Sequence, residues 1–506
     1  MDWVFARLRV PAMQENETLI GFEPVTRRRA GGWWETEHSG TAVWPERTQE
    51  SDGQSTADEP VTEANSNFES TQAVKKGRAV RELWIVGKGH SLSYMGLFLF
   101  TAVLYFRPYE LSPALAGFSS IAFWIAAATL MVFVPSQLIL EGNFTALPRE
   151  VKLVLLLAIV AFLSIPLAID SSEAWATFSD AFAKAIAMFI VMINVVRTER
   201  RLKGLLGLAL LVGCVLSIGA LRDFHNGVLT IEGYRVEGSI GGMFANPNDM
   251  ALYLVTVTPI AVALLFCARG LLKKLLFFCC TLLLIGGNMV TYSRGGFLGL
   301  LAVVFVLAWK IGRQNRFLIS IVLLVGGAAF VVLAPGGYGR RLLSIFFPNL
   351  DAVGSSTARK ELLMRSLLVA ARHPFFGIGM GNFHIVGIKE HVSHNAYTQV
   401  ASELGVLALI FYVLFMVNPI KRLMAIEKAT FEHVKGESTS YFLAVGLQAS
   451  LIGYMVSSFF VSVAYLWYVY YLVGFAVALR RIYQSRQPQG LQVEGTGTKK
   501  VAVVTV

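Results

Sequence analysis

The sequence predicts an all-α protein of about twelve membrane-spanning helices, with one long extracytoplasmic loop between the ninth and tenth helices. Hydrophobic residues make up 55% of the 506 residues, charged residues only 15%, and the mean hydropathy of +0.58 exceeds that of soluble proteins. Apolar stretches of bilayer length recur from Leu92 onward. From the fourth stretch on, every second connection is basic, as expected for cytoplasmic loops.

Residues 1–85 differ in composition from the rest of the chain. They are rich in Glu, Thr, Ser, Gly and Arg, hold 14 of the 33 acidic residues, and lack helical periodicity. This composition predicts a disordered tail. Because the acidic residues gather in the tail, the net charge of +11 reflects basic residues spread along the remainder, and it gives no support to a nucleic-acid partner.

The transmembrane domain is predicted over residues 86–482, followed by a cytoplasmic tail at 483–506. A helix needs about 20 residues, at 1.5 Å each, to cross the hydrocarbon core. The predicted spans are 92–107, 114–140, 151–169, 179–196, 203–221, 248–267, 271–290, 295–312, 316–334, 397–418, 440–460 and 462–480.

The basic connections predict the orientation of the chain, because Lys and Arg are retained on the cytoplasmic side during insertion. Both termini are then cytoplasmic, and residues 222–247, 291–294 and 335–396 face the other side, which is the periplasm in a bacterial inner membrane. The basic residues that mark the cytoplasmic side are Arg197, Arg200, Arg201, Lys203, Arg269, Lys273, Lys274, Lys310, Arg313, Arg316, Lys421, Arg422, Lys428, Lys435, Arg480, Arg481 and Arg486.

The long loop 335–396 carries more Arg and Lys than Asp and Glu, against the usual bias for an outer loop. Guanidinium groups match phosphate oxygens, so the excess predicts an anion site; an ordinary solvated loop is the alternative. Residues 356–372 predict a helix along the membrane surface. The glycines of 377–383 allow close approach of backbone N–H groups to a ligand, and a plain turn explains them equally well.

Four of the eight histidines fall in the last part of this loop, and His394 directly precedes the tenth span. The four are His373, His384, His391 and His394. No cysteine or carboxylate set completes a zinc site, so no metal is predicted. A neutral imidazole can accept a hydroxyl proton near neutral pH, which makes His394 a candidate base; a capping or packing histidine is the alternative.

Two further arginines lie on the same predicted face. Arg235 precedes the stretch 241–248, and Arg294 lies between two apolar helices. An arginine at such a junction is energetically unfavourable unless it contacts an anion or extends to the membrane interface. Arg294 is therefore a candidate for binding an anion, and extension to the interface is the alternative.

Over residues 90–480 the chain resembles the O-antigen ligase and polymerase superfamily of bacterial envelope glycan enzymes. The motifs that carry the resemblance are Arg235 with FANPN at 244–248, Ser293-Arg294-Gly295, RHPFFGIGMGNF at 372–383, and His394-Asn395-Ala396-Tyr397 followed by Glu403-Leu404-Gly405. The tail 1–85 is not part of this pattern.

The resemblance implies transfer of a glycan from an undecaprenyl-diphosphate carrier to an acceptor hydroxyl at the outer leaflet, by direct displacement with inversion, without a cofactor or a metal. His394 would be the base and Arg294 the main group stabilising charge on the leaving diphosphate. The other residues implied are Arg235, Arg359 and Arg372 for diphosphate binding, and Asn395, Tyr397, Glu403, Gly379 and Gly381 in support.

The acceptor stays open: in the family it is lipid A-core for ligases, another carrier-linked glycan for polymerases and protein for some oligosaccharyltransferases, and a ligase and a polymerase fit the motifs equally well. Two other functions are the alternatives. A transporter would show charges near the membrane midplane or broken helices in repeated halves, and neither is evident in the sequence. Loss of polymer in His394→Ala at normal membrane levels of the protein would argue against a non-catalytic scaffold of a polysaccharide assembly complex.

Overall fold

The computed structural model describes residues 89–486, apart from 112–116, 118–119, 230, 239, 314–315, 335, 345–346, 348–354, 389–390 and 435–437. The predicted N-terminal tail, 1–85, lies outside the described residues. Of the predicted C-terminal tail, 483–506, only 483–486 are described, and they belong to helix α19 (Trp467–Arg486).

The described part of the chain is built from α-helices, with short 3₁₀ and π segments at their ends, and its only bridge between extended residues joins Ile231 to Arg235. Nine of its helical segments are long and apolar enough to cross a membrane. The prediction of an all-α polytopic membrane protein is therefore confirmed, whereas the number twelve stays a prediction. The main helices are α2 (Ser91–Phe106), α4 (Ile121–Glu141), α5 (Arg149–Ser164), α6 (Ser171–Thr177), α7 (Ala183–Val195), α8 (Glu199–His225), α9 (Pro247–Cys267), α10 (Leu271–Val290), α11 (Arg294–Ile311), α12 (Arg316–Leu333), α17 (Val406–Val434), α18 (Thr439–Ser457) and α19.

The tenth predicted span, 397–418, is not one helix. It is divided into α16 (Ala396–Leu404) and α17 by Gly405, whose φ of 88° is unfavourable for a residue with a side chain. The break follows from a contact with the preceding loop, because the Val406 N–H donates to the carbonyl of Pro374 over 2.8 Å. A Cβ atom at Gly405 would lie 2.6 Å from that carbonyl oxygen.

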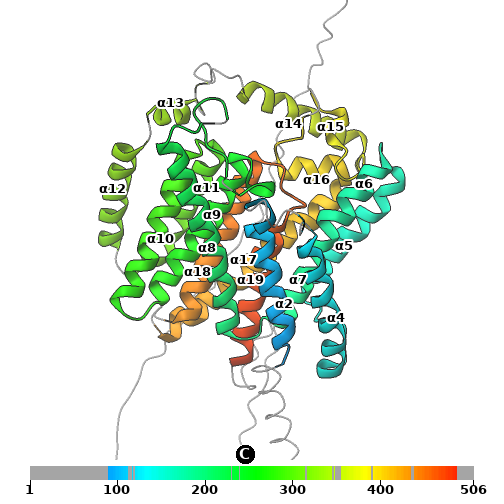
Figure 1. Ribbon diagram of the computed structural model, residues 1–506, viewed down its shortest axis with the longest axis horizontal. Helices are drawn as coiled ribbons and strands as arrows, with labels where there is room; N and C mark the ends of the chain where they lie inside the picture. Colours follow the sequence, from blue (N-terminus) through cyan, green and yellow to red (C-terminus); the bar gives the residue numbers. More distant parts are fainter. Residues whose placement is uncertain are drawn as a thin grey trace, which may run out of the picture. The chain divides into compact units, whose positions relative to one another are not determined.

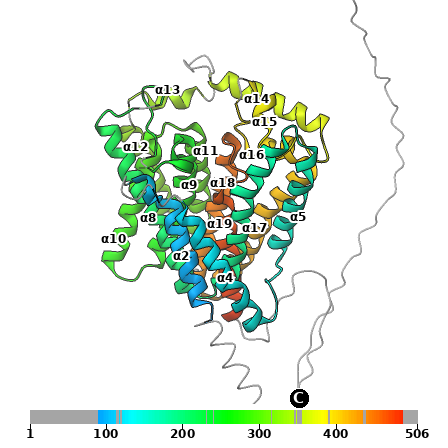
Figure 2. The ribbon, with the colours of Figure 1, turned by 45° about the vertical axis from the view of Figure 1, so that its right-hand side comes forward.

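Three helices of the long loop lie across one end of the helix bundle, which we call the loop end (Figure 1 and Figure 2). They are α13 (Tyr338–Leu343), α14 (Ser355–Arg372) and α15 (Phe383–Val386). The helix predicted over 356–372 corresponds to α14, which ends at Arg372, two residues before the helix-breaking Pro374.

Helix α9 is buried along most of its length and contacts α8, α10, α11 and α18. Glycines on α11 and α18 allow these helices to approach closely: a Cβ atom at Gly453 would lie 2.6 Å from Val303 and 3.0 Å from Val255. At the loop end the Ser457 hydroxyl donates to the carbonyl of Gly295 over 3.2 Å. This packing holds the start of α11 beside the end of α18.

A buried ion pair joins α5 to α19. The Arg480 guanidinium donates through Nη1 and Nη2 to the two carboxylate oxygens of Glu150, at 2.9 and 3.1 Å. Glu150 is fully buried and the Arg480 side chain is 14% exposed. Two parallel hydrogen bonds satisfy both charges, which would otherwise be costly in this environment.

We expect Arg480→Ala to lower the free energy of unfolding by about 3–5 kcal/mol, because it leaves the Glu150 carboxylate buried without its partner. The matched control is Arg486→Ala on the same helix, because the Arg486 side chain is 53% exposed and pairs with Glu199. The control variant should lower the free energy of unfolding by about 1 kcal/mol or less. Denaturant unfolding in detergent micelles measures both, and the added change Glu150→Gln should restore part of the loss. Equal losses in the two arginine variants would contradict the assignment.

Candidate functional site

The start of α11 is held in a defined geometry by its N-cap. The Ser293 hydroxyl accepts from the Gly296 N–H over 3.2 Å, and the preceding Tyr292 has a φ of 51°, in the left-handed region. Left-handed backbone is rare for an aromatic residue and costs on the order of 1 kcal/mol. The surrounding contacts therefore determine the backbone position of Arg294, the first residue of α11.

Arg235 supplies part of that constraint. Its Nε donates to the carbonyl of Thr291 over 2.9 Å, and its Nη2 donates to Asn248 Oδ1 over 2.8 Å. The same Asn248 oxygen accepts from the Ser293 hydroxyl over 2.9 Å. Arg235 is only 4% exposed. It therefore lies inside the wall of the site and links two loops to the cap of α11.

Burial lowers the pKa of Arg235 to about 10, with opposition from Glu232, whose carboxylate lies 3.8 Å from Nη1. The guanidinium is still charged at neutral pH. A buried charge of this kind needs its hydrogen-bond acceptors, so the contacts to Thr291 and Asn248 are required for the local fold.

His394 lies in the turn that leads into α16. Its φ of 52° is also left-handed, a conformation that histidine adopts more often than most residues. The next residue, Asn395, caps α16 by accepting from the N–H groups of Tyr397 at 2.9 Å and Thr398 at 3.2 Å. The Ser393 hydroxyl donates to the carbonyl of Asn395 over 3.0 Å. Residues on both sides of His394 are thus fixed by hydrogen bonds.

These two helix starts meet at one cavity of about 270 Å³. Four of the predicted site residues line it: Arg294, Arg359, His394 and Asn395. The lining residues that the structure describes include three cations and no carboxylate. We call this the arginine–histidine cavity. Its full lining is Arg294, Leu298, Ser344, Arg359, Lys360, Leu363, Ser393, His394, Asn395, Phe459 and Phe460.

The imidazole of His394 is neutral in this setting. Burial, with smaller contributions from the neighbouring Arg359 and His391, lowers the pKa of His394 from 6.5 to about 4. The His391 ring centroid lies 6.3 Å from that of His394. At neutral pH, His394 can therefore accept a proton, while the arginines and Lys360 provide positive charge for an anion.

The glycine-rich segment 377–383 packs against α16 instead of lining this cavity. The buried Glu403 carboxylate accepts from the N–H groups of Gly381 at 3.0 Å and Phe383 at 3.4 Å, and the Glu403 carbonyl accepts from Gly379 over 2.9 Å. Gly379 and Gly381 have φ values of 100° and 78°. These three predicted residues hold the segment to the end of α16.

Two further predicted residues also lie away from the arginine–histidine cavity. The Tyr397 hydroxyl donates to the carbonyl of Met455 over 2.8 Å and so links α16 to α18. Arg372, exposed at the end of α14, lines a second cavity of about 920 Å³ that we call the α14 cavity.

The prediction overlooked several lining residues. Lys360 follows Arg359 and contributes in the sequence only to the positive charge of the loop, and Ser393 is adjacent to His394. Phe459 and Phe460, after α18, carry no polar signal in the sequence, because aromatic residues at the end of a span are typical of a membrane interface.

Over the residues that the structure describes, no group of three or more His, Cys, Asp or Glu side chains could hold a metal ion. His384 has other partners: its Nδ1 lies 3.0 Å from the carbonyl of Gly381, and its Nε2 lies 3.5 Å from a carboxylate oxygen of Glu173.

We expect Gly379→Ala to lower the free energy of unfolding by about 2–4 kcal/mol, because the added Cβ is strained and crowded. It would overlap Cβ of Ala168 and lie 2.9 Å from Cα of that residue. The control is Gly207→Ala on α8, where a Cβ meets no atom within 4 Å and alanine favours the helix. Denaturant unfolding in micelles should separate the two, and an unchanged midpoint for Gly379→Ala would contradict the packing described.

In a comparison with protein families, residues 279–413 match the family model for O-antigen ligase. No curated protein matches the sequence. The matched segment contains Arg294, Arg359 and His394, which share the arginine–histidine cavity. The family implies glycan transfer in general, with glycan and lipid-linked substrates, and agrees with an integral membrane protein. The predicted resemblance to the O-antigen ligase superfamily is thus confirmed over this segment.

Proposed function

We propose that this protein is a metal-independent, inverting glycosyltransferase that takes its glycan from an undecaprenyl-diphosphate-linked donor. It acts as an O-antigen ligase or a surface polysaccharide polymerase. The observation that carries the proposal is the arginine–histidine cavity, which Arg294, Arg359 and Lys360 line together with a neutral His394 within the segment that matches the family.

In the proposed reaction His394 accepts the proton of the acceptor hydroxyl as its oxygen attacks the anomeric carbon of the donor sugar. A new carbon–oxygen bond forms while the bond from that carbon to the diphosphate oxygen breaks on the opposite side, which inverts the configuration. Undecaprenyl diphosphate leaves with the bonding electrons. Arg294 and Arg359 stabilise the negative charge that develops on the leaving oxygen.

Arg235 has a different part in this proposal. Its side chain is buried and its donors are directed at Thr291 and Asn248, so it acts as a positioning residue for Arg294 and does not bind the diphosphate itself. Asn395 caps the helix next to the base, and Tyr397, Glu403, Gly379 and Gly381 hold α16 in place.

The proposed location is the bacterial inner membrane, with both termini cytoplasmic and the reaction at the periplasmic face. The distribution of charge supports this orientation, since the basic C-terminal end of α19 lies opposite the loop end (Figure 1 and Figure 2). A donor carried by a polyprenyl chain would reach the cavity from the outer leaflet.

The direct test is transfer by the full-length protein in liposomes with a polyprenyl-diphosphate-linked oligosaccharide, candidate acceptors and a metal chelator. We expect Arg294→Ala to lower kcat roughly 10²–10³-fold and His394→Ala roughly 10²–10⁴-fold. Arg340→Ala is the matched control, because Arg340 is an exposed arginine on α13 that lines neither cavity. Full activity in both site variants would remove their assignments. Absence of transfer with every acceptor would favour a transporter or a scaffold.

The pH dependence should report His394. In the free enzyme its pKa is about 4, so kcat/KM for the donor should stay constant from neutral pH down to about pH 5 and fall below it. The bound diphosphate adds negative charge and so raises this pKa, which moves the acid limb of kcat to higher pH than that of kcat/KM. His384→Asn, outside the cavity, should leave both limbs in place. Coincident limbs in the wild type would contradict the assignment.

A further inference from the structure

The proposed reaction assigns no role to two phenylalanines that line the arginine–histidine cavity. Phe459 and Phe460 belong to the 3₁₀ turn Ser458–Phe460, which follows α18 and which we call the aromatic turn. Phe459 is 48% exposed, although aromatic side chains are more often covered by the protein. An exposed ring in the wall of a cavity is available to a ligand.

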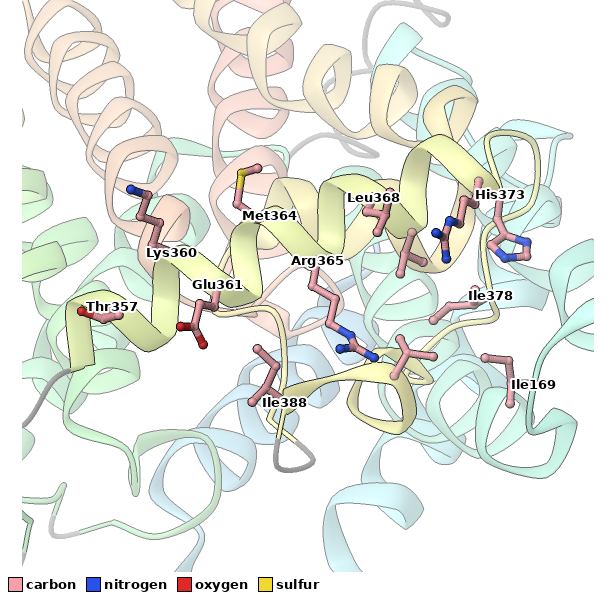
Figure 3. A pocket seen from close by; sticks show the side chains of 13 residues that line it. Ile169, Thr357, Lys360, Glu361, Met364, Arg365, Leu368, His373, Ile378 and Ile388 are labelled. Carbon is pink, nitrogen blue, oxygen red and sulfur yellow. The ribbon is translucent and has the colours of Figure 1, made fainter. Parts of the chain in front are cut away.

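The α14 cavity has a different lining (Figure 3). Among the described residues that line it there is no Phe, Tyr or Trp, and its apolar side chains are mostly aliphatic, such as Ile169, Ile378 and Ile388. Of the two cavities, the arginine–histidine cavity is therefore the one that combines aromatic rings with cations.

The aromatic turn is fixed to both helix starts that form the site. On the side of α11, a Cβ atom at Gly295 would lie 2.8 Å from Cβ of Phe460, so this side chain packs closely on the backbone of the helix. On the other side, the hydroxyl of Ser462, two residues after the turn, lies 3.1 Å from that of Ser393, which precedes His394. The turn therefore connects the start of α11 to the segment that carries the proposed base.

The ring of Phe459 is held in place by neighbouring rings. Its centroid lies 6.2 Å from that of Tyr397 and 5.6 Å from that of Phe460. The Tyr397 hydroxyl in turn donates to the carbonyl of Met455, in the helix that precedes the turn. Phe459 thus presents a preorganised apolar surface, which lowers the entropy lost when a ligand binds to it.

The position of the turn matches the position that the donor sugar needs in the proposed reaction. In a displacement with inversion, the attacked carbon lies between the attacking oxygen and the leaving oxygen. His394 acts on the attacking oxygen, whereas Arg294 and Arg359 act on the leaving oxygen. The sugar ring that contains this carbon therefore lies between these groups, which is where the aromatic turn connects them.

The serines in the cavity wall offer few hydrogen-bond donors to a sugar. The Ser344 hydroxyl donates to the carbonyl of Arg341 over 2.6 Å, and the Ser393 hydroxyl donates to the carbonyl of Asn395 over 3.0 Å. Because a hydroxyl has one proton, both groups can only accept a bond from a sugar. Apart from these serines and Asn395, the neutral lining residues described are Leu298, Leu363, Phe459 and Phe460. Apolar contact must therefore supply much of the affinity for the sugar ring.

An aromatic face suits one side of a sugar ring. The face of a phenyl ring carries partial negative charge, which attracts the weakly positive C–H groups of a pyranose. The cavity of about 270 Å³ lies near the lower end of the range for ligand sites, about 300–1,000 Å³. It therefore has room for one sugar and its phosphate groups, and a longer glycan has to extend out of it.

We propose that Phe459 stacks on the sugar ring attached to the donor diphosphate, and that the protein recognises its donor glycan through this first sugar. The inference rests on the proposed function, since it takes the diphosphate to lie beside Arg294 and Arg359. Phe460 is a positioning residue, which holds the aromatic turn against Gly295.

The test compares the binding of lipid diphosphates with and without a sugar, using the full-length protein in nanodiscs. The probes are undecaprenyl diphosphate and three derivatives that each carry one sugar: N-acetylglucosamine, galactose or rhamnose. We expect the wild type to bind at least one derivative about tenfold more tightly than the bare lipid diphosphate. Equal affinity for all four probes would overturn the proposal.

Variants of Phe459 separate a contact with the sugar from a contact with the carrier. Phe459→Leu should weaken binding of the tightest sugar-bearing probe about fivefold, because leucine is apolar but has no aromatic face. Binding of the bare lipid diphosphate should stay unchanged, and Phe459→Trp should keep the wild-type affinity for both.

Phe305→Leu is the matched control, since it removes an exposed ring of α11 that lines neither cavity, and it should change neither affinity. An equal loss for the bare lipid diphosphate in Phe459→Leu would overturn the proposal, because the ring would then contact the carrier or support the fold. Unchanged binding of the sugar-bearing probe in this variant would also overturn it.

Transfer assays separate this inference from the proposed function. With transfer established, Phe459→Leu should raise KM for the donor about fivefold and leave KM for the acceptor unchanged. An unchanged donor KM would overturn the stacking and leave the proposed function intact. Sugar-dependent binding with the expected variant pattern but no transfer under any condition would overturn the proposed function, whereas the contact between Phe459 and the sugar would stand.

Discussion

The site at the loop end depends on the hydrogen bonds that the buried guanidinium of Arg235 makes to Thr291 and Asn248. The guanidinium bonds the carbonyl of Thr291 and shares Asn248 with the hydroxyl of Ser293, so one charge fixes the residues that precede α11. Because a buried charge without acceptors is unstable by several kcal/mol, this loop cannot relax independently of Arg235. The strained backbone of Tyr292 is kept by the same contacts. The direction of Arg294 is therefore a property of this network more than of α11 alone.

Positive charge in the arginine–histidine cavity favours the binding of an anion but lowers the basicity of His394. Arg359 stabilises a diphosphate and, in the empty cavity, helps to hold the pKa of His394 near 4, which makes the imidazole a weak base. A bound diphosphate offsets that positive charge and restores the basicity of His394. The proposed mechanism thus favours donor binding before proton transfer, and it limits removal of protons from other hydroxyl groups, including water, while the donor is absent.

The sequence was sufficient for the features that depend on local pattern. Hydropathy located the helices, the position of Pro374 located the end of α14, and the topology argument put Arg294, Arg359 and His394 on one face, where they line one cavity. The sequence did not predict features that a contact between distant segments of the chain determines. Gly405 divides the tenth span because its backbone meets the loop at Pro374, and nothing in the helical pattern of 397–418 indicates that loop.

The same limit applies to the roles of charged residues, since the pattern shows a charge but not its partner. The sequence does not indicate that Arg235 donates to Thr291 and Asn248, or that Glu403 binds the backbone of the segment at 377–383. The proposed donor contacts come from helix starts fixed by such buried partners. Exposed loop residues can change without loss of the core, whereas a buried charge needs its acceptors. The geometry at Arg294 and His394 therefore depends on residues that bind no substrate in the proposed reaction.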